Sequence, residues 1–235
     1  MNAAKTKYKN LLKRYAAYAP QYDRKWGRYS AATLSKALEV IPLGDASALL
    51  DVACGTGLFA QMLRRQRPQL QITGVDISSP MLEKAMQRIP PLPGKVTWQL
   101  GTAEQLPVDS AQFDVLTCTN AFHLVQDAAK ALAEFRRVLR SDGTLVLVDW
   151  CRDFPLMKFR AAMLRVFDRQ RRQIRQLDEL TGAIEAAGLA VESKERFRAG
   201  LWGMMCVVAC NPQVPSSRMF DESKSPLAEH SMPVR

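Results

Sequence analysis

The sequence has no long hydrophobic run. Its longest apolar stretches, such as LWGMMCVVAC at 201–210, are much shorter than the roughly 20 residues that a membrane-spanning helix needs. The N-terminal segment MNAAKTKYKNLLKRY contains no apolar core of the kind that a secretory signal requires. We therefore expect a soluble, cytoplasmic protein, although the basic N-terminus also fits an organelle transit peptide.

Cysteine pairs and histidines are also scarce. The five cysteines, at positions 54, 118, 151, 206 and 210, lie in apolar contexts and form no Cys-x-x-Cys pair. This pattern favours reduced thiols over a disulfide framework. The chain has only two histidines, and neither is close in sequence to Cys206 and Cys210, so we expect no zinc or other metal site.

Acidic residues are few in two segments of the chain. Residues 1–30 contain eight Lys or Arg against one acid, and residues 152–175 contain eight against two, within a net charge of +10. The rest of the chain is therefore slightly acidic. These two basic appendages fit contact with an anionic lipid, a nucleic acid or an anionic substrate, and they equally fit helices with solvated faces.

Length and periodicity indicate one α/β domain with appendages. The 235 residues suffice for a single well-packed core. Strand-like and helix-like periods alternate, which predicts a doubly wound, mostly parallel seven-stranded sheet with helices on both faces and an antiparallel last hairpin. The expected strands are 48–53, 70–76, 95–100, 113–119, 144–150 (after a turn at 141–143), 189–198 and 201–210, and the expected helices are 8–19, 29–41, 58–66, 80–89 (with Ser79 as N-cap), 127–140 and 178–187.

Three further segments complete the expected organisation. Residues 1–44 are expected to form a helical lid over the main domain, which spans 45–210. Within that domain, the basic amphipathic segment 153–176 has no place in a minimal doubly wound unit, so we expect an inserted helix. Residues 211–235 are rich in Pro and Ser and poor in large apolar residues, which predicts a disordered tail.

Very small residues follow the first expected strand. In LLDVACGTGLFAQML (49–63), an apolar strand passes through the loop 53–57 into a helical pattern. Ligands of open α/β sheets bind at the carboxyl ends of the strands, so this loop predicts close approach of a ligand to the backbone. The loop matches neither Gly-x-Gly-x-x-Gly nor the phosphate loop, which argues against a dinucleotide enzyme and favours a nucleoside ligand without phosphates.

Four segments between about residues 45 and 150 carry a family resemblance. They are LLDVACGTG, GVDIS, GTAEQLPVDSAQFDVLTC and FRRVLRSDGTLVLVDW. In this order and spacing they resemble the class I S-adenosylmethionine (SAM)-dependent methyltransferases, in particular the ubiquinone/menaquinone C-methyltransferase type. The resemblance implies a Rossmann-like fold of that class and SAM as the cofactor.

The resemblance also implies the cofactor contacts. Asp51 and the backbone near Gly55 match the positions that hold the methionine end of SAM. Asp76 matches the acid that accepts both ribose hydroxyls, a role that suits two carboxylate oxygens, although capping of the next helix is an alternative. The sequence departs from the family pattern at two positions. Residue 53 is Ala where many members have Gly, and residue 102 is Thr where the family often has Asp. The expected cofactor-binding residues are Asp51, Ala53, Cys54, Gly55, Thr56, Gly57, Asp76, Ile77, Ala103, Glu104 and Asn120.

The segment TNAFHL (119–124) is expected to face both SAM and the methyl acceptor. Methyltransferases that modify adenine bases have an Asn/Asp-Pro-Pro-aromatic segment there, and NAFH lacks both prolines, which disfavours DNA-base methylation. His123 is the candidate catalytic base, because an imidazole can take a proton from a phenol or an activated carbon acid, and packing of the pocket wall is the alternative. The expected acceptor pocket comprises Tyr22, Trp26, Trp150, Phe154 and Phe167.

The expected function is methyl transfer from SAM to a small apolar or aromatic molecule, such as a quinone precursor or another lipid-like compound. The arginines of 153–176 suit contact with an anionic membrane surface. Two other functions stay open at this point. One is an RNA or protein methyltransferase guided by the basic arms, for which nucleic-acid binding would depend strongly on salt. The other is a SAM-binding scaffold without catalytic activity.

Overall fold

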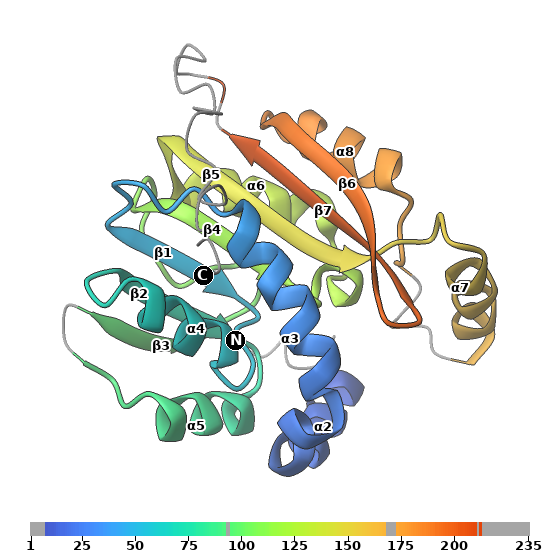
Figure 1. The fold of residues 1–235 in the computed structure, drawn as a ribbon, viewed down its shortest axis with the longest axis horizontal. Coiled ribbons are helices and arrows are strands. Elements are labelled where there is room, and N and C mark those ends of the chain that lie inside the picture. Colours follow the sequence, from blue (N-terminus) through green and yellow to red (C-terminus); the bar gives the residue numbers. More distant parts are fainter. Residues whose placement is uncertain (1–7, 93–94, 168–172, 211, 213–235) are drawn as a thin grey trace, which may run out of the picture.

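The computed structural model describes residues 8–92, 95–167, 173–210 and 212, and within them a seven-stranded sheet forms the centre of the protein (Figure 1). The strand order is β3-β2-β1-β4-β5-β7-β6, and β7 is antiparallel to both of its neighbours. The predicted sheet, mostly parallel with an antiparallel last hairpin, is confirmed. The strands are β1 (Ala48–Val52), β2 (Gln71–Asp76), β3 (Val96–Leu100), β4 (Phe113–Thr119), β5 (Leu139–Trp150), β6 (Ala190–Ala199) and β7 (Trp202–Cys210).

Helices cover both faces of this sheet. The helices α3, α4 and α5 pack on one face, and α6 and α8 pack on the other (Figure 1). Within the described ranges, no helix combines the length and the apolar character needed to cross a bilayer. The helical elements are α2 (Lys9–Tyr18), η1 (Ala19–Gln21), α3 (Tyr22–Val40), α4 (Leu58–Gln66), α5 (Ser79–Arg88), η2 (Phe122–Leu124), α6 (Ala128–Val138), α7 (Pro155–Phe167) and α8 (Leu177–Ala186).

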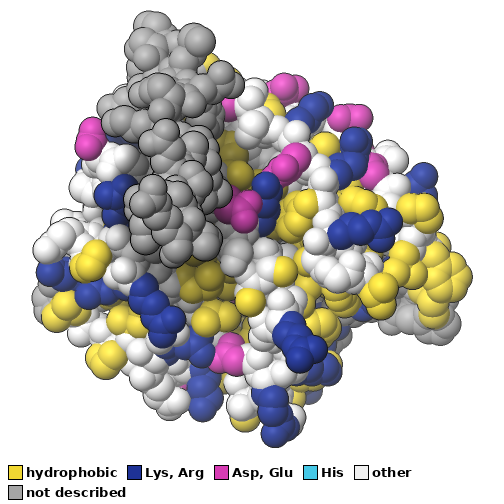
Figure 2. Space-filling model, in the orientation of Figure 1, with side chains coloured by type: hydrophobic (Ala, Val, Ile, Leu, Met, Phe, Trp, Pro, Cys, Tyr) yellow, Lys and Arg dark blue, Asp and Glu magenta, His cyan; other side chains and the backbone are white. Residues whose placement is uncertain are grey.

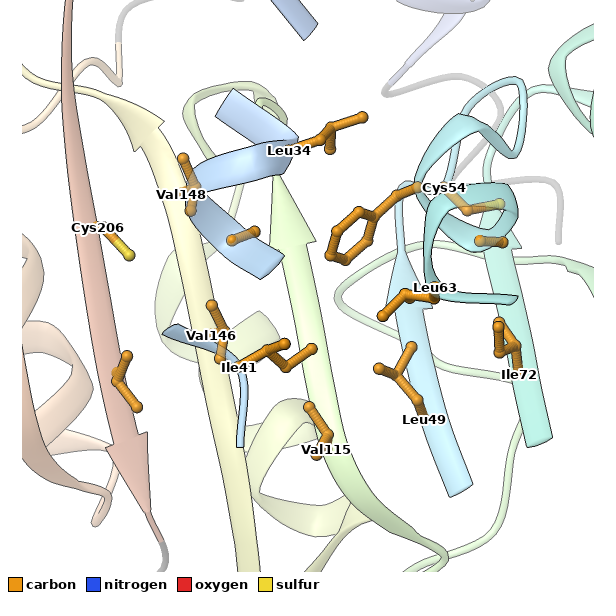
Figure 3. Close-up of a cluster of buried hydrophobic side chains, with 14 of the residues drawn as sticks. Leu34, Ile41, Leu49, Cys54, Leu63, Ile72, Val115, Val146, Val148 and Cys206 are labelled. Atoms are coloured by element: carbon orange, nitrogen blue, oxygen red, sulfur yellow. The ribbon is translucent and has the colours of Figure 1, made fainter. Parts of the chain in front are cut away.

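Alternation along the strands supplies the two hydrophobic cores. Leu49 packs among the side chains under α3 and α4, whereas its neighbour Leu50 packs among those under α6 and α8. Figure 3 shows the first cluster, where Leu63 of α4 and Val146 of β5 lie over the same face of the sheet. Because both faces of the sheet are buried, the sequences of the central strands are almost continuously apolar, as expected for parallel strands.

The direction of winding reverses between β1 and β4. From β1 the chain proceeds outward to β2 and β3, and from β4 it proceeds to the opposite side through β5. At such a switch point the two connecting loops leave in opposite directions, which opens a crevice at the carboxyl ends of the central strands. The loop 53–57 and the segment 119–124 border this crevice.

Several boundaries differ from the expectations based on periodicity. β5 begins at Leu139, so residues 141–143 belong to the strand and do not form the expected turn. The pairing of β4 with β5 shifts register between Phe113 and Val115, and this irregularity lets the strand extend back to the end of α6. In α5, Ser78 takes the N-cap position predicted for Ser79, because the Ser78 carbonyl accepts the first bonds of the helix.

The N-terminal helices are nearly continuous. The expected helix 8–19 corresponds to α2, but the second helix begins at Tyr22 and not at residue 29. The two are joined by the short 3-10 turn η1, in which Pro20 occupies an early position that requires no N–H. Pro20 therefore lies within a nearly continuous helical run from Lys9 to Val40 and does not end it.

The inserted helix α7 is shorter than the expected helix 153–176. It begins at Pro155, a residue suited to the first turn of a helix. Residues 173–176 are not helical, because Arg175 forms an isolated bridge with Cys151 and its carbonyl accepts from the Arg152 N–H at 2.8 Å. The expected disordered tail, 211–235, lies outside the described residues apart from Pro212.

Candidate functional site

A pocket that is partly open to solvent lies at the carboxyl ends of β1, β2 and β4. Its floor comes from strand ends and the following loops, and its roof comes from α2 and from the start of α3. The lining residues that the sequence analysis had named as cofactor or acceptor contacts are Tyr22, Ala53, Gly55, Asp76, Ile77, Ala103, Glu104 and Asn120.

The loop 53–57 approaches the pocket with three residues in the left-handed region. Ala53, Gly55 and Gly57 have φ angles of 58°, 55° and 73°. A Cβ on Gly55 would meet nothing within 4 Å, so this residue is constrained by its conformation and leaves open space beside the pocket. A Cβ on Gly57 would lie 3.0 Å from atoms of Ala85 and Trp98. Gly57 therefore serves the packing of α4 against α5 and β3, and it does not line the pocket.

Asp76 joins the glycine loop to the pocket wall. Its Oδ2 accepts from the Gly55 N–H at 2.9 Å, and its Oδ1 accepts from the Ser78 N–H at 2.8 Å. Burial raises the pKa of this carboxyl to about 6, against the lowering effect of these backbone hydrogen bonds. Each carboxylate oxygen can accept a second bond, so Asp76 can hold the two loops in place and still accept from a diol.

Asp51 lies behind the loop and not on the pocket wall. Its side chain is 1% exposed, and Oδ1 accepts from the Thr117 hydroxyl at 2.9 Å. Burial raises the pKa of Asp51 to about 7. Its other oxygen, Oδ2, is buried and has no hydrogen-bond partner among the described residues. A buried acceptor without a donor is costly, so this atom fits a cationic ligand group such as an ammonium.

Glu104 connects the wall that follows β3 to the roof. The Tyr8 hydroxyl of the roof donates to Glu104 Oε1, which also accepts from the Gln126 N–H at 3.2 Å. Burial, and the bond to Glu104, raise the pKa of Tyr8 above its usual range. The second oxygen, Oε2, is buried and has no partner within the described part of the chain. The carboxylate thus anchors the roof and retains one free acceptor.

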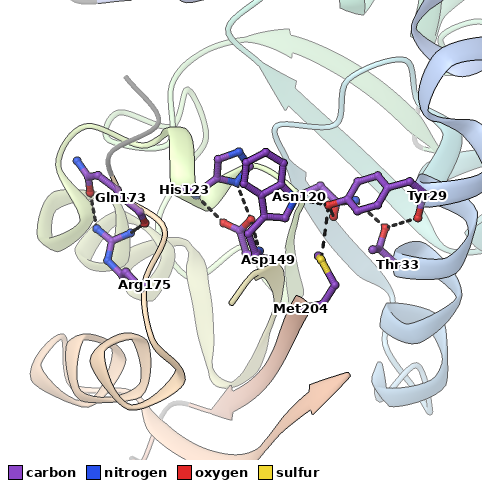
Figure 4. Close-up of polar contacts among 9 residues, drawn as sticks. Tyr29, Thr33, Asn120, His123, Asp149, Gln173, Arg175 and Met204 are labelled. Carbon is purple, nitrogen blue, oxygen red and sulfur yellow. Dashed lines mark hydrogen bonds and ion pairs between the residues drawn. The ribbon is translucent and has the colours of Figure 1, made fainter. Parts of the chain in front are cut away.

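Asn120 ends β4 in a left-handed conformation with φ of 58°. Its Oδ1 accepts from the Tyr29 hydroxyl at 2.7 Å, and its Nδ2 donates to Thr33 Oγ1 at 2.7 Å (Figure 4). Both partners belong to α3. The amide therefore positions α3 over the pocket.

His123 and Asp149 form a buried pair beside the pocket (Figure 4). His123 Nδ1 lies 2.6 Å from Asp149 Oδ1, and the His123 backbone N–H donates to Asp149 Oδ2. A carboxylate can only accept, so this contact favours the imidazole tautomer with its proton on Nδ1 and leaves Nε2 as the acceptor. His123 does not line the pocket, but Ala121 and Leu124 on either side of it do.

Aromatic rings continue from His123 toward α3. The His123 ring stacks on Trp150 with centroids 4.1 Å apart, and Trp150 stacks on Trp202 at 4.8 Å. The Trp150 indole N–H donates to the Tyr29 hydroxyl at 2.7 Å, which connects the stack to Asn120 and the pocket. Arg160 of α7 lies with its guanidinium carbon 4.1 Å from the Trp202 ring centroid. None of these rings lines the pocket; the cluster lies behind it and is connected to it through the bond between Tyr29 and Asn120.

Other expected site residues have structural roles away from the pocket. Cys54 is buried in the core under α4, and Thr56 donates to Asp23 of α3 at 2.7 Å. Phe154 packs on Gly203, and Trp26 contacts the Trp202 ring edge-on at 6.0 Å. The side chain of Phe167 lies outside the described part of the structure. Thr119, Ala121 and Leu124 also line the pocket and belong to the segment 119–124 that was expected to face it. The pocket-lining residues not assigned to the site from the sequence are Tyr8, Leu11, Tyr15, Val52, Val75, Met81, Gly101, Thr102, Cys118 and Val125.

Solved structures share this fold. A chain in the complex formed by the Haloferax volcanii Trm112 methyltransferase activator superposes with a TM-score of 0.71 at 17% identity, covering 84% of this chain and 97% of that one. At this identity the comparison establishes the fold alone. The fold and the pocket together define an α/β protein with a nucleoside-type site at the switch point of its sheet.

Sequence comparisons establish the family. Residues 50–147 match the family described as "Methyltransferase domain". A ubiquinone/menaquinone biosynthesis C-methyltransferase of Citrifermentans bemidjiense is 30% identical over 64% of this chain and 67% of its own length. A demethylmenaquinone methyltransferase of Deinococcus radiodurans is 36% identical, and the match spans 58% of each protein. The chain belongs to the class I SAM-dependent methyltransferases, in the group of these quinone C-methyltransferases.

SAM fits the groups that the pocket offers. Asp76 could accept from the ribose hydroxyls, and Glu104 would offer one acceptor on the adenine side. The buried Oδ2 of Asp51 lies behind the loop 53–57, from where its charge would favour the ammonium of the methionine end. The remaining lining is mostly apolar and, over the described ranges of the chain, includes no Lys or Arg that could pair with a phosphate, so it suits a nucleoside without phosphates. Family and pocket agree on the cofactor, as the sequence analysis predicted.

Proposed function

We propose that the protein transfers the methyl group of SAM to a small aromatic or apolar acceptor of the quinol type. The observation that carries the proposal is the pocket at the switch point, in which Asp76 and the loop 53–57 meet at hydrogen-bond distance. The relatives named as quinone methyltransferases support the acceptor class. The mostly apolar lining of the pocket supports it as well, because an apolar surface suits a flat apolar ring.

The chemistry requires little of the protein beyond placement. SAM, when bound, supplies an electrophilic methyl group on a sulfonium. The protein must hold the acceptor in line with that methyl group and keep water away, which is the effect of proximity and orientation. The roof residues Tyr8, Leu11 and Tyr15 are positioned for the exclusion of water.

We further propose that His123 accepts the proton that an aromatic carbon or a phenol loses on methylation. In this proposal the new bond joins the methyl group to the acceptor, the sulfonium bond breaks, and the acceptor proton moves to His123 Nε2. Asp149 holds the ring through Nδ1 and stabilises the imidazolium that forms. Because His123 is buried next to Trp150, the proposal requires the acceptor to enter between Leu124 and the ring stack.

The first experiment is titration calorimetry with SAM and with its demethylated product, S-adenosylhomocysteine, using NAD and ATP as controls. We expect selective binding of the first two. Labelled SAM is then offered with prenylated and short-chain hydroquinones, with simple phenols, and with total RNA and protein as competing acceptors. Transfer to the hydroquinones supports the proposal.

Each other result overturns a different part of the proposal. Transfer to RNA or protein replaces the proposed acceptor class. Selective SAM binding without transfer to any acceptor replaces catalysis by a binding role. If the protein binds SAM, NAD and ATP equally, or binds none of them, the assignment of SAM as the cofactor is overturned as well.

A further inference from the structure

Four large apolar side chains lie exposed at one end of the molecule. Leu156, Phe159 and Met163 of α7 are 51%, 65% and 47% exposed, and Leu201 in the turn between β6 and β7 is 78% exposed. The positions 156, 159 and 163 recur at helical spacing, so they form one stripe on the outer side of α7. We call these four residues the α7 face. The other exposed large hydrophobic residues within the described part of the chain, Met86, Leu92 and Leu100, belong to the α5 and β3 region.

The inner side of α7 is packed firmly. Met157 and Ala161 are buried in the core, and the Phe154 ring lies so close to Gly203 that a Cβ there would approach it to 2.2 Å. Arg160 stacks over Trp202. These contacts join the start of α7 to the first residues of β7, next to the turn that carries Leu201. The exposed stripe is therefore a fixed surface of the fold.

Positive charge accompanies the α7 face. Lys158 and Arg198 are exposed beside it, and the sequence has no Asp or Glu from 154 to 167. The nearby acid Asp153 is paired with Arg196. Figure 2 shows hydrophobic side chains gathered over the α7 end of the molecule, with Lys and Arg side chains around them. An apolar stripe flanked by cations complements a surface that is apolar inside and anionic at its boundary.

The position of the helix fits a lipid surface. In Figure 1, α7 projects at the edge of the molecule. A projecting stripe with a cationic border suits shallow insertion between lipid headgroups, whereas a protein partner would be expected to meet a broader contact surface. The α7 face also lies toward the carboxyl end of β5, because Trp150 pairs with Met204 close to the β6–β7 turn.

We propose that the protein docks on anionic lipid bilayers through the α7 face, with Phe159 and Leu201 inserted among the headgroups. This proposal rests on the proposed function only for its purpose, which is to bring the acceptor side of the pocket to a membrane that holds an apolar acceptor. The docking itself depends on the exposed residues and their charges.

The test is co-sedimentation of the full chain with phosphatidylcholine vesicles, with and without phosphatidylglycerol. We expect binding that requires phosphatidylglycerol and weakens with salt. The double variant Phe159→Asp with Leu201→Asp should lower the apparent affinity by about tenfold or more, since it removes apolar contact and adds repulsion. The matched control is Met86→Asp with Leu100→Asp, which alters exposed apolar residues elsewhere and should bind like the parent. Thermal unfolding of both variants checks that they fold.

The outcomes separate the two proposals. Equal vesicle binding by the parent and the α7-face variant, or binding that ignores phosphatidylglycerol, overturns the docking. Analytical ultracentrifugation tests a second copy of the chain as the partner. If the parent self-associates but does not bind vesicles, and the α7-face variant no longer self-associates, a second copy replaces the membrane in this proposal. SAM binding, and methyl transfer to a short-chain hydroquinone in detergent-free buffer, test the proposed function separately. We expect the α7-face variant to match the parent in both measurements.

Discussion

The wall formed by β1, β2 and the loop 53–57 differs in construction from the wall formed by the ends of β4 and β5. The first wall depends on backbone conformation and on the bond between Gly55 and Asp76, with Asp51 close behind it in the sequence and in the fold. The second wall is supported from behind by side chains of distant elements, namely Tyr29, His123, Trp150 and Trp202. A wall built from one local segment can bind the same cofactor in many relatives. A wall supported by distant side chains can change to suit another acceptor, and this change leaves the cofactor wall unaltered.

The largest expected effect tests the acceptor wall. Replacing His123 by Gln keeps a polar side chain of similar reach but removes the base, so we expect kcat to fall about 100-fold. The affinity for SAM should stay within about twofold of the parent. Steady-state kinetics with the best hydroquinone and calorimetry with SAM measure the two quantities. His230→Gln, the other histidine of the chain, is the matched control. An unchanged kcat in His123→Gln removes the base from the proposal.

The next effect tests the cofactor wall. Asp76→Asn keeps the size of the side chain but replaces one accepting oxygen by a donor, which opposes both the Gly55 N–H and a ribose hydroxyl. We expect the affinity for SAM to fall at least about tenfold, as for loss of a hydrogen bond to a charged group. Calorimetry measures it, and Asp178→Asn on the surface of α8 is the control. Unaltered affinity in Asp76→Asn would contradict the assigned ribose contact.

A pH dependence distinguishes the buried carboxyls of the cofactor wall. In the folded protein the pKa values of Asp51 and Asp76 are raised from 3.8 to about 7 and about 6. Both groups bind protons more tightly in the folded state than in the unfolded state. Their contribution to stability is therefore greatest at low pH and is lost as the pH rises from about 4 to about 7.

The measurement is the unfolding midpoint of the ligand-free protein across this range. We expect it to fall by several degrees from about pH 5 to about pH 8, and to fall less in Asp51→Asn, which cannot ionise. Saturating SAM should also reduce the dependence, because its ammonium favours the charged carboxylate. If the parent and Asp51→Asn lose the same number of degrees, Asp51 does not titrate in this range.

The smallest effect separates two glycines of the loop. Gly55→Ala meets open space and is opposed only by its positive φ, so we expect a loss of about 1 kcal/mol in the free energy of unfolding. Gly57→Ala has the same conformational cost and also crowds Ala85 and Trp98, so its loss should be about 2 to 3 kcal/mol. Urea denaturation measures both. Equal losses would show that Ala85 and Trp98 adjust to the added methyl group.

The sequence predicted the parts of the molecule that depend on local pattern. Alternating periods and the four family segments were enough for the sheet, the family and the cofactor. Periodicity did not locate the start of β5, because the register shift near Phe113 depends on pairing with β4. Periodicity also predicted a helix that continues to residue 176, beyond the end of α7. Arg175 pairs with Cys151 instead, and this contact forms only in the folded chain.

Within the site, prediction was limited by the direction of each side chain. The motif identified Cys54, Gly55 and Gly57 as one small-residue loop, but only the folded backbone distinguishes Gly55 on the pocket wall from Cys54 and Gly57 in the packing. Tyr8 could not be assigned from the sequence, because its partner Glu104 is 96 residues away. Contacts of this kind carry no local signal.

The place of β7 in the sheet has a consequence for synthesis. This strand comes last in the order of described strands, yet it lies between β5 and β6 and pairs with both. A nascent chain that has emerged only as far as β6 leaves two unpaired strand edges facing a gap, and such edges invite wrong pairing. The sheet can close only when residues 202–210 have left the ribosome, so this half of the sheet is completed after the half formed by β1 to β4.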